Sequence, residues 1–142
     1  MTEHSDRVVA YITTRGHLLV FTHLDYPEAG VQVPGGHPEI NESLEMAVIR
    51  ESIEETGLKD LELVEYLGYI DLDLRAKGLG LERRHFYHLH YNGPVTEPWI
   101  HCEMNPSDGT PAPVRFQFKW VSLSEEISLD WDHDAYLHQL VQ

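Results

Sequence analysis

Alternation of hydrophobic and polar residues predicts most of the strands in this chain. The clearest case is Val-Arg-Phe-Gln-Phe-Lys-Trp-Val at residues 114–121, whose apolar side chains would all face one side of a sheet. Other segments with strand-like composition are residues 7–14, 17–23, 31–33, 61–74 and 84–91. Arg15-Gly16 separates the first two of these, which predicts a β-hairpin.

A helix is predicted at residues 44–56. Ser43 is a favourable N-cap residue, and Gly57 suits the position that ends a helix. The segment has apolar residues on two sides: Met46, Ile49 and Ile53 on one, and Leu44, Ala47 and Val48 on the other. Because a helix that is apolar on opposite faces is usually covered on both, we expect it to lie between two layers of a mixed α/β sandwich.

The remaining segments predict a loop and a second helix. Residues 92–113 hold five of the eight prolines, and the length of this segment indicates a functional loop. Residues 132–141 predict a short closing helix. The chain shows no repeat and no domain boundary, and its 142 residues are expected to form one domain.

Charge and composition limit the partners that are plausible. The net charge is −14, which repels polymeric nucleic acid. No apolar run approaches the roughly 20 residues needed to cross a bilayer, and the polar first residues are unlike a signal peptide. The single cysteine, Cys102, cannot form an internal disulfide. We therefore expect a cytoplasmic monomer or homodimer that binds a small molecule and neither a membrane nor nucleic acid.

Three glutamates within the predicted helix carry the strongest chemical signal. Glu51, Glu54 and Glu55 stand at positions i, i+3 and i+4, so their carboxylates share one face of the helix. Like charges this close oppose helix formation unless a cation neutralises them. Oxygen ligands favour a hard divalent ion, so the pattern indicates Mg²⁺ or Mn²⁺. A zinc site is not indicated, because the histidines lack the paired spacing of zinc ligands.

The segment from Gly36 to Leu58 resembles the signature of the Nudix hydrolases, G-x5-E-x7-R-E-U-x-E-E-x-G-U, in which U is a bulky apolar residue. The residues that fit are Gly36, Glu42, Arg50, Glu51, Glu54, Glu55, Gly57 and Leu58. Ser52 departs from the signature at the first U position. We expect it either to face a close neighbour or to bond back to the carbonyl of Val48. The resemblance implies an α/β/α sandwich and a metal-dependent pyrophosphohydrolase.

The resemblance also implies roles for individual residues. Metal ligands would be Glu51, Glu54, Glu55 and the backbone carbonyl of Gly35, as in related enzymes. Arg50 would orient Glu51 or Glu54, because a guanidinium matches a carboxylate with two parallel hydrogen bonds. Glu42 would support the site through the loop or through bound water.

The general base is less defined by the signature, since related enzymes use either a glutamate of the motif or one on a distant loop. Glu97 and Glu103 both lie in the predicted long loop. We favour Glu103, because the preceding Trp99-Ile100 pair could anchor the loop to the core. The candidate catalytic residues are therefore Arg50, Glu51, Glu54 and Glu103.

Substrate identity is left open by the sequence. Marks of several subfamilies are missing, including the proline that ADP-ribose hydrolases carry after the motif, since no proline occurs between Pro38 and Pro94. The favoured substrate is a small nucleoside diphosphate derivative. One alternative is a catalytically silent nucleotide-binding or regulatory module, although such proteins usually have a broken motif. Another is an isomerase of the isopentenyl diphosphate type, but Cys102 lacks the surroundings that this enzyme needs.

Overall fold

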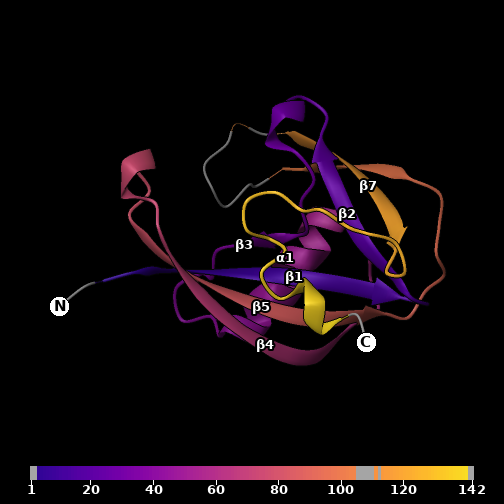
Figure 1. Ribbon diagram of the computed structural model, residues 1–142, viewed down its shortest axis with the longest axis horizontal. Coiled ribbons are helices and arrows are strands. Elements are labelled where there is room, and N and C mark those ends of the chain that lie inside the picture. The colour runs from indigo at the N-terminus through magenta and orange to yellow at the C-terminus, as the bar shows by residue number, and fades with distance from the viewer. Residues whose placement is uncertain (1–2, 105–110, 112, 141–142) are drawn as a thin grey trace.

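The computed structural model describes residues 3–104, 111 and 113–140 and consists of a mixed sheet with a helix packed on it (Figure 1). The strands are β1 Ser5–Thr14, β2 His17–His23, β3 Gly35–Gly36, β4 Leu61–Asp73, β5 Leu81–Tyr91, β6 Trp99–Glu103 and β7 Val114–Ser122. The helix is α1 Leu44–Thr56, and single 3₁₀ turns are η1 Pro27–Ala29, η2 Arg75–Lys77 and η3 Leu137–Gln139. The strand order is β4-β5-β1-β2-β7-β6, with β3 paired to β1. β1 and β5 are parallel, so the predicted mixed α/β fold is confirmed.

The two faces of the sheet carry separate cores. Val8, Ala10 and Ile12 of β1 face α1 and pack with Val48, whereas the intervening Val9 and Tyr11 pack on the other face. The C-terminal segment covers that other face, opposite α1 (Figure 1). None of the helices in the described part of the chain combines the length and apolar character needed to span a membrane.

The predicted bounds of the helix are confirmed, and its caps explain them. Ser43 Oγ accepts a hydrogen bond from the backbone N–H of Met46 at 3.2 Å. Gly57 has φ 77°, a left-handed conformation that favours glycine, and its N–H donates to the carbonyl of Ile53. The expectation that both apolar sides are covered is wrong for one side: Met46 is 65% exposed and Ile53 41% exposed.

The long loop predicted at residues 92–113 is interrupted by β6, which pairs with β7. Trp99, His101 and Glu103 turn inward along this strand, whereas Ile100 and Cys102 are exposed. Two of the three inward residues, His101 and Glu103, are polar, and the outward Ile100 is apolar. This order is the reverse of the usual one, which is why the sequence did not predict a strand here. Residues 105–110 and 112 of the predicted loop lie outside the described residues.

The closing helix predicted at residues 132–141 is also wrong over the described residues, which form only the turn η3 there. The Tyr11 hydroxyl donates to the carbonyl of His133 and accepts from the N–H of Tyr136. These bonds take backbone groups that a helix would use. The strand predicted at residues 31–33 is reduced to a single bridge between Gln32 and Phe21.

Candidate active site

Carboxylates from two distant segments meet beside α1. Oxygens of Glu51, Glu54 and Glu103 all lie within 4.8 Å of one another. Two contacts hold β6 against the end of the helix: Trp99 Nε1 donates to the carbonyl of Thr56 at 3.1 Å, and His101 Nε2 lies 2.9 Å from the carbonyl of Glu54. Because Glu103 ends β6, this docking carries it to the helix.

Three of the acidic side chains at this site are buried, whereas Glu54 is exposed. Glu51 is 2% exposed and Glu55 5% exposed, and Glu103 is buried as well. Burial raises the pKa of Glu51 and raises the pKa of Glu55 strongly, in the second case with help from the nearby charge of Glu103. Glu51 Oε2 has no hydrogen-bond partner among the described residues. Oxygen donors that converge in this way fit a hard divalent cation.

The two glycines that precede the helix permit the close packing of this site. A Cβ on Gly36 would lie 2.2 Å from the carboxyl carbon of Glu51, and one on Gly35 would lie 2.6 Å from the carbonyl oxygen of Val8. The N–H of Gly35 donates to Glu55 Oε2 at 3.3 Å. Gly35, the predicted backbone ligand, is therefore held directly beside one of the predicted carboxylate ligands.

Arg50 connects the carboxylates of the site. Its Nε and Nη2 donate to the two oxygens of Glu42 at 2.8 and 2.9 Å. Its Nη1 donates to Glu51 at 2.9 Å and to Glu54 at 3.2 Å. The hydrogen bonds from Arg50 lower the pKa of Glu42 to about 2. Arg50 is thus placed to orient the acidic side chains, and Glu42 in turn holds Arg50.

The structure separates the two candidates for the general base. Glu103 joins the acidic group, whereas Glu97 is exposed and is not part of that group. Sequence reasoning missed Arg7, whose positive charge partly opposes the rise that burial causes in the pKa of Glu51 and Glu55. No local motif surrounds Arg7, and only the pairing of β1 with β3 brings it near the site.

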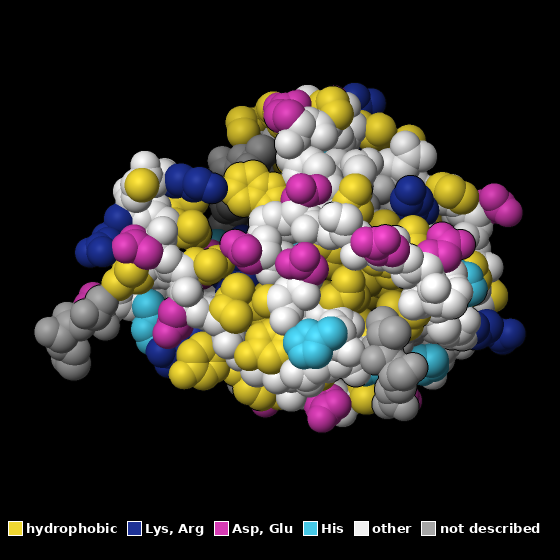
Figure 2. Space-filling model, viewed as in Figure 1, with side chains coloured by type: hydrophobic (Ala, Val, Ile, Leu, Met, Phe, Trp, Pro, Cys, Tyr) yellow, Lys and Arg dark blue, Asp and Glu magenta, His cyan; other side chains and the backbone are white. Residues whose placement is uncertain are grey.

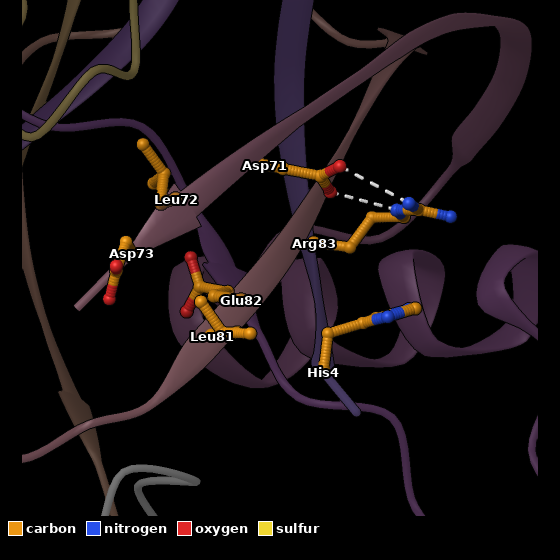
Figure 3. A pocket seen from close by; sticks show the side chains of 7 residues that line it. All are labelled: His4, Asp71, Leu72, Asp73, Leu81, Glu82 and Arg83. Carbon is orange, nitrogen blue, oxygen red and sulfur yellow. Dashed lines mark hydrogen bonds and ion pairs between the residues drawn. The ribbon is translucent and has the colours of Figure 1, made fainter. Parts of the chain in front are cut away.

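A pocket and a groove are among the hollows of the described surface, and they lie at different distances from the acidic group. A pocket of about 270 Å³ lies between the N-terminal segment and strands β4 and β5. Its Asp71 is paired with Arg83 in the same pocket (Figure 3). A shallow groove of about 710 Å³ follows the exposed apolar side of α1 and borders Arg50 and Glu54. Acidic side chains are spread across the face seen in Figure 2, and most basic ones lie toward its edges. Of these two, only the groove adjoins the acidic group.

Comparison with known proteins agrees with this geometry. The NUDIX domain family matches residues 3–140 of the chain. No curated protein sequence matches it. A MutT NUDIX hydrolase from Burkholderia pseudomallei has a similar structure, with 25% identity, a TM-score of 0.66 and 99% of each chain covered.

Two more distant structures share the fold. A UDP-X diphosphatase is 15% identical with a TM-score of 0.65, and 99% of the present chain covers 62% of that protein. A bifunctional NMN adenylyltransferase/ADP ribose pyrophosphatase from Francisella tularensis, complexed with AMP and a manganese ion, is 21% identical with a TM-score of 0.59. The match covers 99% of the present chain and 42% of that one.

Proposed function

Because the chain belongs to the NUDIX family and is a hydrolase of that family, we propose that it cleaves the pyrophosphate bond of a small nucleoside diphosphate derivative with the help of Mg²⁺ or Mn²⁺. The observation that carries the proposal is the convergence of Glu51, Glu54 and Glu103 within 4.8 Å. Proteins rarely bury several carboxylates together unless a ligand compensates them. The presence of every glutamate of the signature argues against a silent binding module.

Each residue of the site has a distinct task in this proposal. Glu51, Glu54, Glu55 and the carbonyl of Gly35 would hold the cation. A divalent ion supplies Lewis-acid polarisation of phosphoryl oxygens and lowers the pKa of water that it binds. Arg50 keeps Glu51 and Glu54 in place through its hydrogen bonds. No covalent nucleophile is needed.

Glu103 is proposed to accept the proton of the attacking water. Its buried position beside Glu51 and Glu54 supports this role. Loss of a general base typically costs about 10²–10⁴-fold in turnover. Glu103→Gln should therefore lower kcat under saturating Mg²⁺ with little change in Mg²⁺ affinity, whereas Glu51→Gln should weaken Mg²⁺ binding. Glu97→Gln is the matched control and should leave both kcat and Mg²⁺ affinity unchanged. Unchanged kcat in Glu103→Gln would place the base within the motif.

The activity itself is tested with a panel of nucleoside diphosphate derivatives and nucleoside triphosphates, with Mg²⁺ or Mn²⁺. Phosphate is measured after a phosphatase removes it from the products. We expect turnover of at least one compound and none in excess EDTA. A protein that binds a nucleotide but cleaves none above the rate of a Glu54→Gln variant would be the silent module. Turnover that continues in EDTA would contradict the metal site.

A further inference from the structure

Two arginines are neighbours on adjacent strands of the sheet, close to the signature loop. Arg7 of β1 is the direct neighbour of Arg84 of β5 in the parallel pairing. The residue after Arg7, Val8, pairs with Gly36. Arg7 therefore stands at the junction between the sheet and the loop that carries the acidic site. Its charge reaches Glu51 and Glu55, where it partly opposes the rise in pKa that burial causes.

The charge of Arg84 is neutralised within the chain. Its Nε donates to Glu82 Oε2 at 2.9 Å, and its Nη2 lies 2.7 Å from the same oxygen. Its Nη1 donates to the carbonyl of Trp131. Arg84 and Glu82 are both buried. These partners within the chain account for the burial of the charged Arg84 side chain.

Arg7 has no such compensation. Among the described residues it makes no ion pair within 4.0 Å. Its Nε is buried and has no hydrogen-bond partner there. Its Nη1 lies 3.3 Å from His37 Nε2. A guanidinium has five N–H donors and is always charged, so most of the donor capacity of Arg7 is unused.

His37 fixes the direction of Arg7. The ring nitrogen Nδ1 of His37 lies 3.2 Å from the carbonyl oxygen of Asp6, which can only accept a hydrogen bond. Nδ1 therefore carries the proton, and in the neutral ring Nε2 accepts from Arg7 Nη1. His37 belongs to the signature loop, so the loop itself holds Arg7 beside the acidic site.

We propose that Arg7 binds a phosphoryl oxygen of the diphosphate substrate and that His37 positions it for this contact. The proposal rests on the proposed function, because it assumes that a diphosphate enters the acidic site. A guanidinium matches the geometry of phosphate oxygens and can donate to two of them at once. In a chain of net charge −14, a cation of this kind would lower the repulsion that an anionic substrate meets.

A purely internal task for Arg7 makes a different prediction. If Arg7 served only as a counter-charge for Glu51 and Glu55, its removal would change the affinity for the cation and leave the affinity for phosphate groups at saturating cation unchanged. A cation and a guanidinium repel each other, so Mg²⁺ would then bind more tightly to the variant. Separate measurements of Mg²⁺ and of a diphosphate distinguish the two tasks.

The test measures binding of methylenediphosphonate, which cannot be hydrolysed, by calorimetry at saturating Mg²⁺. Arg7→Gln should weaken this binding at least tenfold, and the loss should persist whatever change Mg²⁺ affinity shows, because the cation is saturating. Arg7→Lys keeps the charge but not the planar donor geometry, so a smaller loss is expected, and this variant serves if Arg7→Gln does not fold. Arg83→Gln, which removes an arginine paired with Asp71 away from the site, is the matched control and should bind as the wild type does.

His37→Gln should weaken methylenediphosphonate binding less than Arg7→Gln does, since it removes only the contact that positions the guanidinium. A folded Arg7→Gln variant with wild-type affinity for methylenediphosphonate would overturn the proposal, and so would a wild-type protein that does not bind this compound. Binding needs no turnover. If the wild type binds methylenediphosphonate through Arg7 but hydrolyses no nucleotide, the proposed function fails and the assignment of Arg7 stands.

Discussion

The two faces of the sheet differ in how far the chain itself satisfies their buried polar groups. The side of α1 buries the carboxylates of Glu51 and Glu55, and the side of the C-terminal segment buries Arg84 and His133. Arg84 and His133 are both satisfied by the chain. Arg84 is paired with Glu82, and His133 Nδ1 accepts from the N–H of Val33 at 3.1 Å. Burial lowers the pKa of His133 to about 3, so its ring is neutral near pH 7.

The carboxylates on the α1 side are satisfied less completely. Glu51 shares Arg50 with Glu42 and Glu54, and its Oε2 has no hydrogen-bond partner among the described residues. Glu55 receives only a hydrogen bond of 3.3 Å from Gly35 among the described contacts. The chain thus compensates the buried charge of Arg84 internally, and the incomplete compensation of Glu51 and Glu55 supports the proposal that they serve a ligand.

The largest effect is expected where the compensated pair is broken. Glu82→Ala leaves Arg84 buried without its carboxylate, and removal of one partner of a buried ion pair typically costs about 3–5 kcal/mol. The free energy of unfolding in urea measures this loss. Asp71→Ala breaks the exposed pair with Arg83 and should cost less than about 1 kcal/mol. Equal losses in the two variants would remove the distinction between buried and exposed pairs.

Substitution of the carboxylates beside α1 should lower activity rather than stability. Glu54→Gln and Glu55→Gln keep the shape of the side chain and remove a ligand charge, so each should lower kcat by about 10²–10³-fold on a substrate that the wild type cleaves. Without metal, Glu55→Gln should be at least as stable as the wild type, because it removes a buried charge. Exposed Glu62→Gln is the control. Near wild-type rates in both site variants would show that these residues are not ligands.

The pH dependence of the free energy of unfolding tests the role of His133, which is buried under the C-terminal segment. The pKa of His133 lies near 3 in the folded protein and near 6.5 when unfolded, so the unfolded state binds the proton first as the pH falls. His133 therefore stabilises the fold above pH 6.5 and loses this contribution as the pH falls from 6.5 toward 3. By pH 5 the loss is about 2 kcal/mol. His133→Gln should show a shallower acid loss in urea unfolding, and exposed His138→Gln should follow the wild type.

Ser52 gives the smallest expected change. It is buried, and its hydroxyl has no hydrogen-bond partner among the described residues, so the predicted bond to the carbonyl of Val48 is absent. Ser52→Ala should change the free energy of unfolding by less than about 1 kcal/mol, in the stabilising direction. Thr56→Val is the contrast, because Thr56 Oγ1 donates to the carbonyl of Ser52 at 2.6 Å and accepts from Leu58. A large loss in Ser52→Ala would reveal a buried partner of this hydroxyl.

Local chemistry made much of the site predictable. The helix bounds follow from Ser43 and Gly57, which act on backbone groups within a turn of themselves. The spacing of Glu51, Glu54 and Glu55 places their carboxylates together on any helix. The bond of Arg50 to Glu54 also follows, since residues four apart are neighbours on one face of a helix.

The prediction failed where a segment's neighbours lie far away in the chain. β6 has an inverted pattern because its inward residues meet α1 and the acidic site rather than an apolar core. The exposed side of α1, with Met46 and Ile53, has the periodicity of a buried stripe. The predicted closing helix is absent because the hydroxyl of Tyr11, more than a hundred residues earlier in the chain, bonds backbone groups of His133 and Tyr136.

The sequence by itself determined the family, the helix and the three acidic residues on it, because caps and side-chain spacing depend on a few adjacent residues. Only the tertiary structure decided that Glu103 joins those acids, that Glu97 does not, and that Arg7 stands uncompensated beside them. Strand register decides which residues from distant parts of the chain come together. It depends on the packing of the whole sheet rather than on any local pattern.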